Sequence, residues 1–183
     1  MKTPFRILIT VDSFVLLAEA MLGPIYALYV KTIGGDLLAA SATFATFSIV
    51  AGISIFFVSK YVDRIKEKEL VVASGYVMTG IVFLGYIFIQ SAFQLFFLQI
   101  FLGIGVALLR PTFDALLTKY VNKSRAVSQW GVWEGMNTMM LGVGALVGGI
   151  IAANYGFIPL FVAMATLCFA SASFIFFLPR KVL

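Results

Sequence analysis

The chain has 183 residues, of which 62% are hydrophobic and 11% charged, and its mean hydropathy is +1.06. A soluble domain of this length cannot bury so much apolar surface, because polar groups must cover its exterior. Composition therefore excludes an ordinary soluble domain and predicts an all-α membrane protein. The pI near 9.4 does not indicate a nucleic-acid partner, since the basic residues lie in scattered short loops and not along one face.

Reactive side chains are scarce. The chain has no histidine and a single cysteine, Cys168, which lies in an apolar run where a packing role is favoured. The sequence contains no nucleophile–histidine arrangement, no metal-ligand cluster and no phosphate-binding loop. We therefore expect no enzyme activity, no cofactor and no metal, and any proton binding near neutral pH falls to carboxylates.

Six segments are apolar and long enough to cross the hydrocarbon core, which needs about 20 mainly apolar residues per helix. They run approximately from Phe5 to Val30, Leu38 to Val58, Leu70 to Ile89, Phe93 to Leu117, Val127 to Ala153 and Ile158 to Leu178. The pattern predicts one six-helix transmembrane domain over residues 1–183.

The basic residues gather on one side of the predicted membrane, where the turn between Lys60 and Glu69 alone holds seven of the chain's 21 charges. Only Lys31 falls on the other side. Those on the first side are Lys2, Arg6, Lys60, Arg64, Lys66, Lys68, Lys119, Lys123, Arg125, Arg180 and Lys181. Because positively charged loops stay in the cytoplasm, the pattern predicts cytoplasmic termini, in what we expect to be a prokaryotic cytoplasmic membrane.

Charged residues inside the spans are informative, because each costs roughly 2.5–3.5 kcal/mol at mid-membrane on insertion scales. Spans one, four and five contain charges, whereas the interiors of spans two, three and six contain none. The polar residues in those three spans include Asp12, Glu19, Gln99, Arg110, Asp114, Glu134 and Asn137. Since such residues turn toward the bundle interior, we expect most of them, with Tyr26 and Trp130, to bind substrate or protons.

The first span carries a polar stripe, since Asp12, Glu19 and Tyr26 recur every seven residues. At a rise of 1.5 Å per residue, Glu19 lies roughly 20 Å from the cytoplasmic start of its helix. No basic residue is obviously at that depth, which favours a functional role for Glu19. Asp12 lies nearer the boundary, where a solvated or salt-bridged residue is the simpler interpretation.

Arg110 and Glu134 lie at similar depths in spans four and five, and we predict that they pair, either for function or as a structural ion pair. Arg110 and Asp114 could also meet, being four residues apart on one helix. Asp114 is close enough to the boundary to be solvated instead. Trp130 shares a helix face with Glu134 and Asn137, with an interfacial belt position as its alternative role.

A short internal echo relates the two halves of the chain. The sequence around Pro24 reads GPIYALYVK, and the sequence around Pro111, 87 residues later, reads RPTFDALLTK. The first span runs outward and the fourth inward, so the pattern predicts two three-helix repeats related by inversion. Inverted repeats with proline-broken helices near the binding site occur in several transporter folds.

Three motifs resemble signatures of the major facilitator superfamily, in the right order along essentially the whole chain. The turn SKYVDRIKEK is similar to Gly-x-x-x-Asp-Arg-x-Gly-Arg-Lys, with Asp63, Arg64 and Lys68 matching. In the fourth span QIFLGIGVA is similar to Arg-x-x-x-Gly-x-Gly. There Gly103 and Gly105 match, while Gln99 stands where the family has its arginine.

The third motif lies in the fifth span, where GALVGG resembles the antiporter signature Gly-Pro-x-x-Gly-Gly. Gly144, Gly148 and Gly149 match, but Ala145 replaces the proline, so the antiporter label does not transfer. Glycines at such spacing also form helix-packing surfaces in membranes, which is the role expected for these and for the glycines of the fourth span. The chain thus resembles one six-helix half of such a transporter.

The resemblance implies an arrangement and a gate. In this family the first and fourth helices of each half line the central cavity, the second and fifth form its sides, and the third and sixth face lipid. The cytoplasmic signature latches the inner gate against the opposite half's fifth helix, near its amino end. This implies a gating role for Asp63 and Arg64, and we group Asp114 with them; the alternative is a merely solvated turn.

Familiar members have twelve helices in two parallel halves, and this chain supplies six. We therefore predict a parallel homodimer enclosing one cavity, which works by alternating access as a proton-coupled secondary transporter of a small molecule. Glu19 and Glu134 are the candidates for binding a proton or a cationic substrate. The alternatives are a non-transporting scaffold or accessory subunit, a heterodimer with another half, and a fragment of a longer chain.

Overall fold

The computed structural model describes residues 3–178, and within them every regular element is helical. The α-helices are α1 (Thr3–Leu22), α2 (Tyr26–Thr32), α3 (Leu37–Val62), α4 (Lys68–Gly85), α5 (Ala92–Tyr120), α6 (Ala126–Tyr155) and α7 (Phe157–Phe177). Three short 3-10 helices join some of them: η1 (Gly23–Ile25), η2 (Tyr86–Phe88) and η3 (Lys123–Arg125). The predicted all-helical fold is confirmed for this part of the chain.

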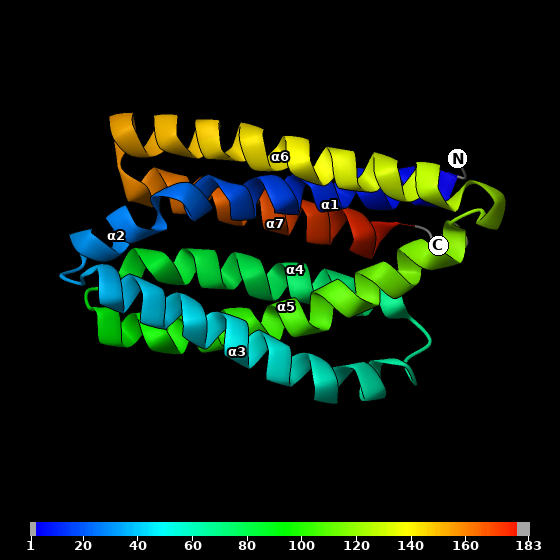
Figure 1. Cartoon of the computed structure of the whole chain (residues 1–183), viewed down its shortest axis with the longest axis horizontal. Coiled ribbons are helices and arrows are strands. Elements are labelled where there is room, and N and C mark those ends of the chain that lie inside the picture. Colours follow the sequence, from blue (N-terminus) through cyan, green and yellow to red (C-terminus); the bar gives the residue numbers. More distant parts are fainter. Residues whose placement is uncertain (1–2, 179–183) are drawn as a thin grey trace.

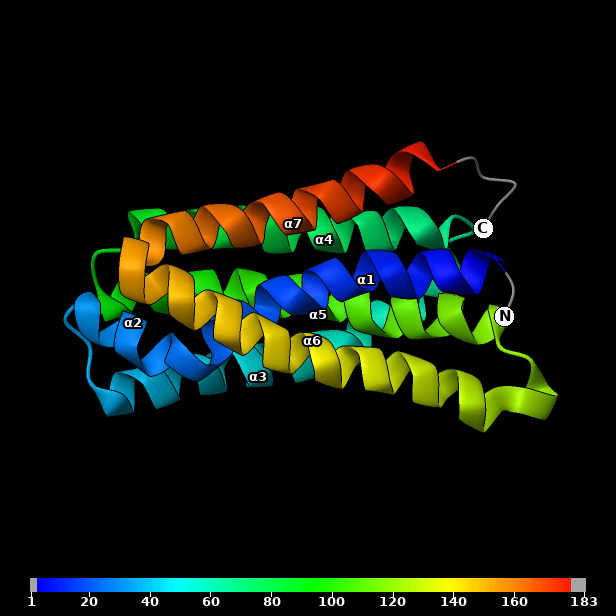
Figure 2. The ribbon, with the colours of Figure 1, turned by 90° about the horizontal axis from the view of Figure 1, so that it is seen from above.

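The long helices run side by side in two layers (Figures 1 and 2). One layer consists of α1, α6 and α7, and the other of α3, α4 and α5. The layers pack tightly where α4 meets α7, whereas no comparable packing joins α3 to α6 among the described residues. The bundle is therefore closed along its α4–α7 side and open along its α3–α6 side.

Both layers mix helices from the two halves of the chain. The helix α1 does not pack mainly on α3 and α4, which follow it in the sequence, but on α6 and α7. The helix α5 packs instead on α3 and α4. Each predicted triplet thus exchanges its first helix with the other. The consequence for the site is that α1 and α5, which carry most of the intramembrane charges, lie in the middle of their layers and face one another (Figure 2).

The turns segregate by charge as the sequence predicts. The α3–α4 turn, the α5–α6 turn, the start of α1 and the end of α7 all lie at one end of the bundle (Figure 1). The short connections after α2, η2 and α6 lie at the other end. Lys2, Arg180 and Lys181, which contribute to the predicted charge asymmetry, fall outside the described residues.

Among the described residues, five helices are long and apolar enough to cross a membrane. They are Leu37–Val62, Lys68–Phe88, Ala92–Tyr120, Lys123–Tyr155 and Phe157–Phe177. The first predicted span is not among them, because α1 carries Arg6, Asp12 and Glu19 within 20 residues.

The first predicted span is also not continuous. The helix changes to 3-10 geometry at Gly23–Ile25, where Pro24 has no N–H to donate, and resumes as α2. Pro111 behaves differently, since α5 continues through it. The two proline segments that form the echo in the sequence therefore have different structures.

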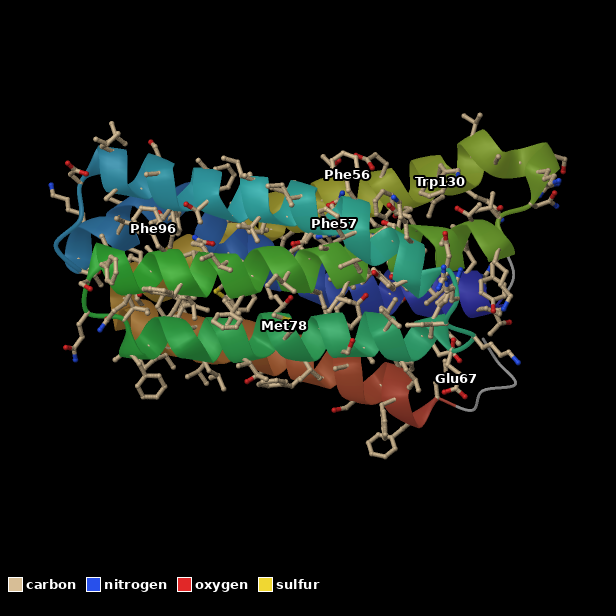
Figure 3. The ribbon with its side chains drawn as sticks, turned by 90° about the horizontal axis from the view of Figure 1, so that it is seen from below. Phe56, Phe57, Glu67, Met78, Phe96 and Trp130 are labelled. Atoms are coloured by element: carbon tan, nitrogen blue, oxygen red, sulfur yellow. The ribbon has the colours of Figure 1, made fainter. Side chains whose placement is uncertain are left out.

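Glycines set two of the close helix contacts. A Cβ atom at Gly144 or Gly148 would collide with the backbone of α1 near Ala20 and Met21, and one at Gly103 would collide with α3. A Cβ atom at Gly105 would lie 3.3 Å from Cγ of Met78 on α4 (labelled in Figure 3), which is a tight contact. The packing role predicted for these four is confirmed.

Gly149 does not share that role. No atom outside its own segment lies within 4 Å of the position a Cβ would take, so the packing prediction is wrong for this glycine. Its Cβ direction is turned by about 100° from that of Gly148, which takes it away from the contact with α1.

Burial differs sharply between the helices. In the most apolar segment of each helix, 11% of the residues are buried in α3 and 11% in α6. The corresponding shares are 56% in α4 and 44% in α7. Phe56 and Phe57 illustrate the bare side of α3 (Figure 3), with exposed fractions of 76% and 64%. The resemblance implies that the third and sixth spans face lipid. Among the five candidate spans, α4 and α7 are instead the best buried in this chain, because they form the closed side of the bundle.

Candidate functional site

An ion cluster joins the two layers at the centre of the bundle. Arg110 of α5 donates from Nη2 to Oε2 of Glu19 on α1 at 2.5 Å. Its Nη1 lies 4.0 Å from Oδ2 of Asp12, one polar stripe position earlier on α1. One guanidinium therefore holds two carboxylates, and the predicted common face of Asp12 and Glu19 is what allows it to do so.

Asp12 is the most deeply buried of the three, with a side chain that is 1% exposed. Its Oδ1 accepts a hydrogen bond from the hydroxyl of Tyr76 at 2.9 Å, and its Oδ2 has no hydrogen-bond partner. Of the two alternatives for Asp12, the structure supports the salt-bridged one, with Arg110, and contradicts the solvated one. The solvated alternative fails because α1 lies in the middle of its layer, so that nearness to the helix end does not bring this face into contact with water.

Tyr76 was not identifiable from the sequence. It comes from α4, a span without internal charge, and it is completely buried. The signal it offers is a tyrosine in an apolar run, and buried tyrosines usually find a hydrogen-bond partner. That rule predicts that a partner exists, but it does not name Asp12.

The predicted pair between Arg110 and Glu134 does not form. Among the described residues, Arg110 makes its ion pairs with Glu19 and Asp12, and Glu134 is exposed on the outer side of α6. The long Arg110 side chain reaches Glu19 across the layers, so a basic group does lie at the depth of Glu19. Asp114 is exposed and makes no ion pair with Arg110 in this structure.

The rest of the predicted stripe on α6 is only partly inside the bundle. Asn137 is half-buried, and Trp130 (labelled in Figure 3) is half-buried and stacks edge-on against Trp133 at 5.7 Å between ring centroids. Trp133 in turn lies 6.3 Å from the ring of Phe113 on α5 and has an unpartnered Nε1. In this part of α6, Trp133 lies against α5, while Glu134 is exposed.

A chain of hydrogen bonds connects three helices beyond the ion cluster. The amide of Gln99 on α5 donates from Nε2 to the hydroxyl of Tyr26 on α2 at 2.5 Å. The Tyr26 hydroxyl lies 2.7 Å from that of Thr43 on α3, and Thr43 donates to the carbonyl of Ala39 at 2.7 Å. Tyr26 and Gln99, both predicted site residues, are thus brought together.

A cavity of about 540 Å³ lies beside these groups, between α1, η1, α2, α3 and α5, with side chains from the end of α4 and from η2. A cavity of this size suits a drug-sized ligand. Its polar lining includes Glu19, Arg110, Gln99 and Tyr26. Most of the remaining lining is apolar, for example Phe44, Phe47, Phe83, Leu22, Leu102 and Val106.

The charged turn at 63–67 is a separate feature at the basic end of the bundle. Asp63 follows the last residue of α3 and is largely exposed, with Oδ1 3.8 Å from Nζ of Lys68. Arg64 is exposed, and its backbone N–H donates to the carbonyl of Tyr61. An exposed pair of this kind contributes little stability.

No group of three or more metal-binding side chains lies together within the described residues. The candidate site therefore consists of the ion cluster, the hydrogen-bond chain and the cavity that both of them border.

Comparison with known proteins gives a consistent result. The model of the Major Facilitator Superfamily matches residues 9–182. An uncharacterized MFS-type transporter of Methanocaldococcus jannaschii is 27% identical over 85% of this chain. A multi-drug resistance efflux pump homolog of Lactococcus lactis is 28% identical over 81% of it, and a proton-coupled antiporter flippase of Staphylococcus epidermidis is 26% identical over 56%.

The matched relatives are longer than this chain. The aligned region covers 40% of the Methanocaldococcus protein, 37% of the Lactococcus protein and 28% of the Staphylococcus protein. A family model that spans nearly the whole sequence, together with apolar helices of membrane-crossing length, settles the class of protein. The chain is an integral membrane protein that belongs to the major facilitator superfamily.

Proposed function

We propose that this chain is a secondary active transporter of a small molecule, coupled to protons and working by alternating access as a parallel homodimer. The observation that carries the proposal is the cluster of Asp12, Glu19 and Arg110 between the two layers, at the edge of a cavity. Opposite charges buried amid hydrocarbon mark ion and substrate pathways in membrane proteins.

Glu19 is the residue that we assign to substrate or proton binding. It borders the cavity, and its Oε1 has no hydrogen-bond partner. Asp12 lies behind it with a similarly unpartnered oxygen, so the cluster has room for a proton on either carboxylate. Glu134 is the other predicted candidate for binding a proton or a cationic substrate. Its role depends on which surface covers the exposed face of α6.

Transport by reconstituted protein tests this assignment. Proteoliposomes with an imposed proton gradient are screened for gradient-driven movement of candidate substrates, with wild type, Glu19→Gln and Glu69→Gln compared. We expect Glu19→Gln to abolish coupled transport and Glu69→Gln, at the start of α4, to leave it intact. Unaltered transport by Glu19→Gln would refute the assignment.

Two faces of the bundle support the homodimer. The α3 and α6 helices bury little of their apolar surface, and Glu134 lies on α6 where lipid would meet it. A charge in that position is costly, which favours cover by a second bundle. In the proposed dimer the α3–α6 side of one copy meets the same side of the other, and Asp63 and Arg64 lie near the partner's fifth span.

Native mass measurement in mild detergent tests the assembly. A dimer of this chain supports the proposal, whereas an active monomer refutes it. A stoichiometric complex with a different six-helix protein, or a longer product from the same gene, would favour the heterodimer or fragment alternatives.

We further infer six crossings, with α1, η1 and α2 together forming the first, in two inverted triplets with both termini in the cytoplasm of a prokaryotic cell. The exchange of α1 and α5 between the layers supports the two triplets, because both triplets lose the corresponding helix. Cysteines introduced at Ser124 and at Ser91 provide the test. A membrane-impermeant thiol reagent added outside cells should label the cysteine at 91 and spare the one at 124.

The rival function is a scaffold that retains the fold without transport. The bare α3 and α6 faces suit a partner protein as well as a second copy. Under this alternative, neutralising Glu19 changes stability only, and no substrate moves in the reconstituted assay.

A further inference from the structure

The hydrogen-bond chain beside the cavity is consistent in one direction. The Thr43 hydroxyl lies within donating distance of the carbonyls of Ala39 and Ala40. With the single Thr43 proton directed there, the Tyr26 hydroxyl donates to Thr43. The Tyr26 oxygen therefore accepts, which requires the NH₂ of Gln99 to face it. In this arrangement Oε1 of Gln99 is a buried acceptor without a donor.

Glu19 presents the same deficiency nearby. Arg110 satisfies its Oε2, but its Oε1 has no donor either. Both residues border the same cavity, and Gln99 is 2% exposed, so water in the bulk does not serve it. A buried acceptor without a donor costs about 1–3 kcal/mol, which a ligand with suitable N–H or O–H groups would recover.

Charge narrows the class of ligand. When ionised, Asp12, Glu19 and Arg110 carry one more negative charge than positive, and the remaining residues that line the cavity are uncharged. A ligand with a single positive charge balances this excess. Glu19 and Tyr26 are seven residues apart, on either side of the 3-10 turn at Gly23–Ile25, which corresponds to about 10 Å where the two helices run in line. One small head group therefore does not reach both Glu19 and the acceptor of Gln99.

We propose that this cavity binds an elongated amphipathic ammonium ion, with its N–H groups on Glu19, its apolar body among Phe44, Phe47 and Phe83, and a second donor at Gln99. The inference rests on the proposed transport function for its biological meaning, but the binding itself does not require transport. Three N–H donors distinguish an ammonium head from a quaternary ammonium, which offers none.

Binding to purified protein in nanodiscs of phosphatidylglycerol, without any gradient, tests the proposal by calorimetry. The probes are hexylamine, aminohexanol, hexyltrimethylammonium and hexanol, which share one chain length. We expect aminohexanol to bind most tightly, hexylamine next, and the quaternary ion and the neutral alcohol at least about tenfold more weakly than hexylamine. Equal binding of hexylamine and either of the last two overturns the proposal.

Variants of Glu19 and Gln99 test which residue binds which end of the ligand. Glu19→Gln should weaken both amines at least about tenfold. Gln99→Leu should remove the preference for aminohexanol over hexylamine and leave hexylamine binding unchanged. Replacement of a merely structural glutamine would instead weaken the binding of both amines. Failure of Glu19→Gln to weaken either amine overturns the assignment of the head group.

Two further measurements separate a lipid ligand from a free amine, and ligand binding from transport. In nanodiscs with phosphatidylethanolamine, a fall in apparent affinity would identify a lipid headgroup as the source of the ammonium, and unchanged affinity would favour a free amine. Amine binding that survives in protein inactive for transport would leave this inference standing while the proposed function fails. Transport of ligands without N–H donors, with no amine binding, would give the opposite result.

Discussion

Two carboxylates of the same type, Glu19 and Glu134, lie inside predicted spans and meet opposite surroundings. Glu19 lies between the layers, pairs with Arg110 and borders a cavity, whereas Glu134 is exposed on the bare side of α6. The first is compensated by the chain's own residues and the second is not. A charged residue in a span therefore does not by itself indicate the interior of its own bundle; under the proposed dimer, Glu134 would face the interior of the assembly.

The largest loss of stability is expected from removing Arg110, the cation of the cluster that contains Glu19. Arg110→Leu leaves two carboxylates in the bundle without their cation, and removing one partner of a buried ion pair costs about 3–5 kcal/mol. We expect a large drop in the detergent melting temperature and in folded yield. Arg110→Lys is the control, since it retains the charge and should recover part of the loss. A melting temperature equal to wild type for Arg110→Leu would mean that the cluster is not formed.

A smaller loss is expected where α6 contacts α1. Gly148→Ala places a methyl group against the backbone of Met21, and overpacking of this kind costs about 1–3 kcal/mol. Gly149→Ala is the matched control on the adjacent, open side, where better helix propensity gives no loss. Thermal unfolding of both variants measures the difference, and equal melting temperatures would contradict the α1–α6 contact.

The hydrogen bond from Tyr76 to Asp12 should have a comparable or slightly smaller effect. Tyr76→Phe keeps the ring and removes the donor, which costs about 1–3 kcal/mol when the acceptor is buried. Tyr61→Phe, at an exposed position on α3, should change the melting temperature by much less. If the two variants unfold alike, Tyr76 does not support Asp12.

The smallest effect on the isolated bundle is expected at Glu134. Because its side chain has no partner within the described structure, Glu134→Gln should shift unfolding by no more than about 0.5 kcal/mol. In the assembled dimer the same change should alter the monomer–dimer equilibrium measured by native mass spectrometry. A strong destabilisation of the monomer would instead place Glu134 inside the bundle and remove the contrast with Glu19.

Much of the fold follows from local rules that the sequence obeys. Apolar runs of membrane-crossing length locate α3 to α7 to within a few residues, and the basic turns group at one end. The break at Pro24 was missed because apolar length alone does not distinguish a continuous helix from two helices in line. The continuous helix at Pro111 shows why proline by itself does not decide the matter.

The site was only partly predictable for a related reason. Spacing by seven places Asp12 and Glu19 on one face, but it does not say which helix lies opposite. Depth alone favoured Glu134 as the partner of Arg110, whereas the exchange of α1 and α5 between layers brings Arg110 to Glu19. Tyr76 and Thr43 are ordinary core residues by sequence, and only tertiary packing shows that each completes a hydrogen bond.

The short 3-10 turn at Gly23–Ile25 has a mechanical consequence. Gly23 and Pro24 form part of the cavity wall, and the turn connects α1, held to α6 at Gly148, with α2, held to α3 through Tyr26. A molecule in the cavity would therefore contact η1, the turn between α1 and α2. Of these two helices, α1 is packed in one layer and α2 is bonded to the other. Binding or release of a ligand there would then change the angle between α1 and α2.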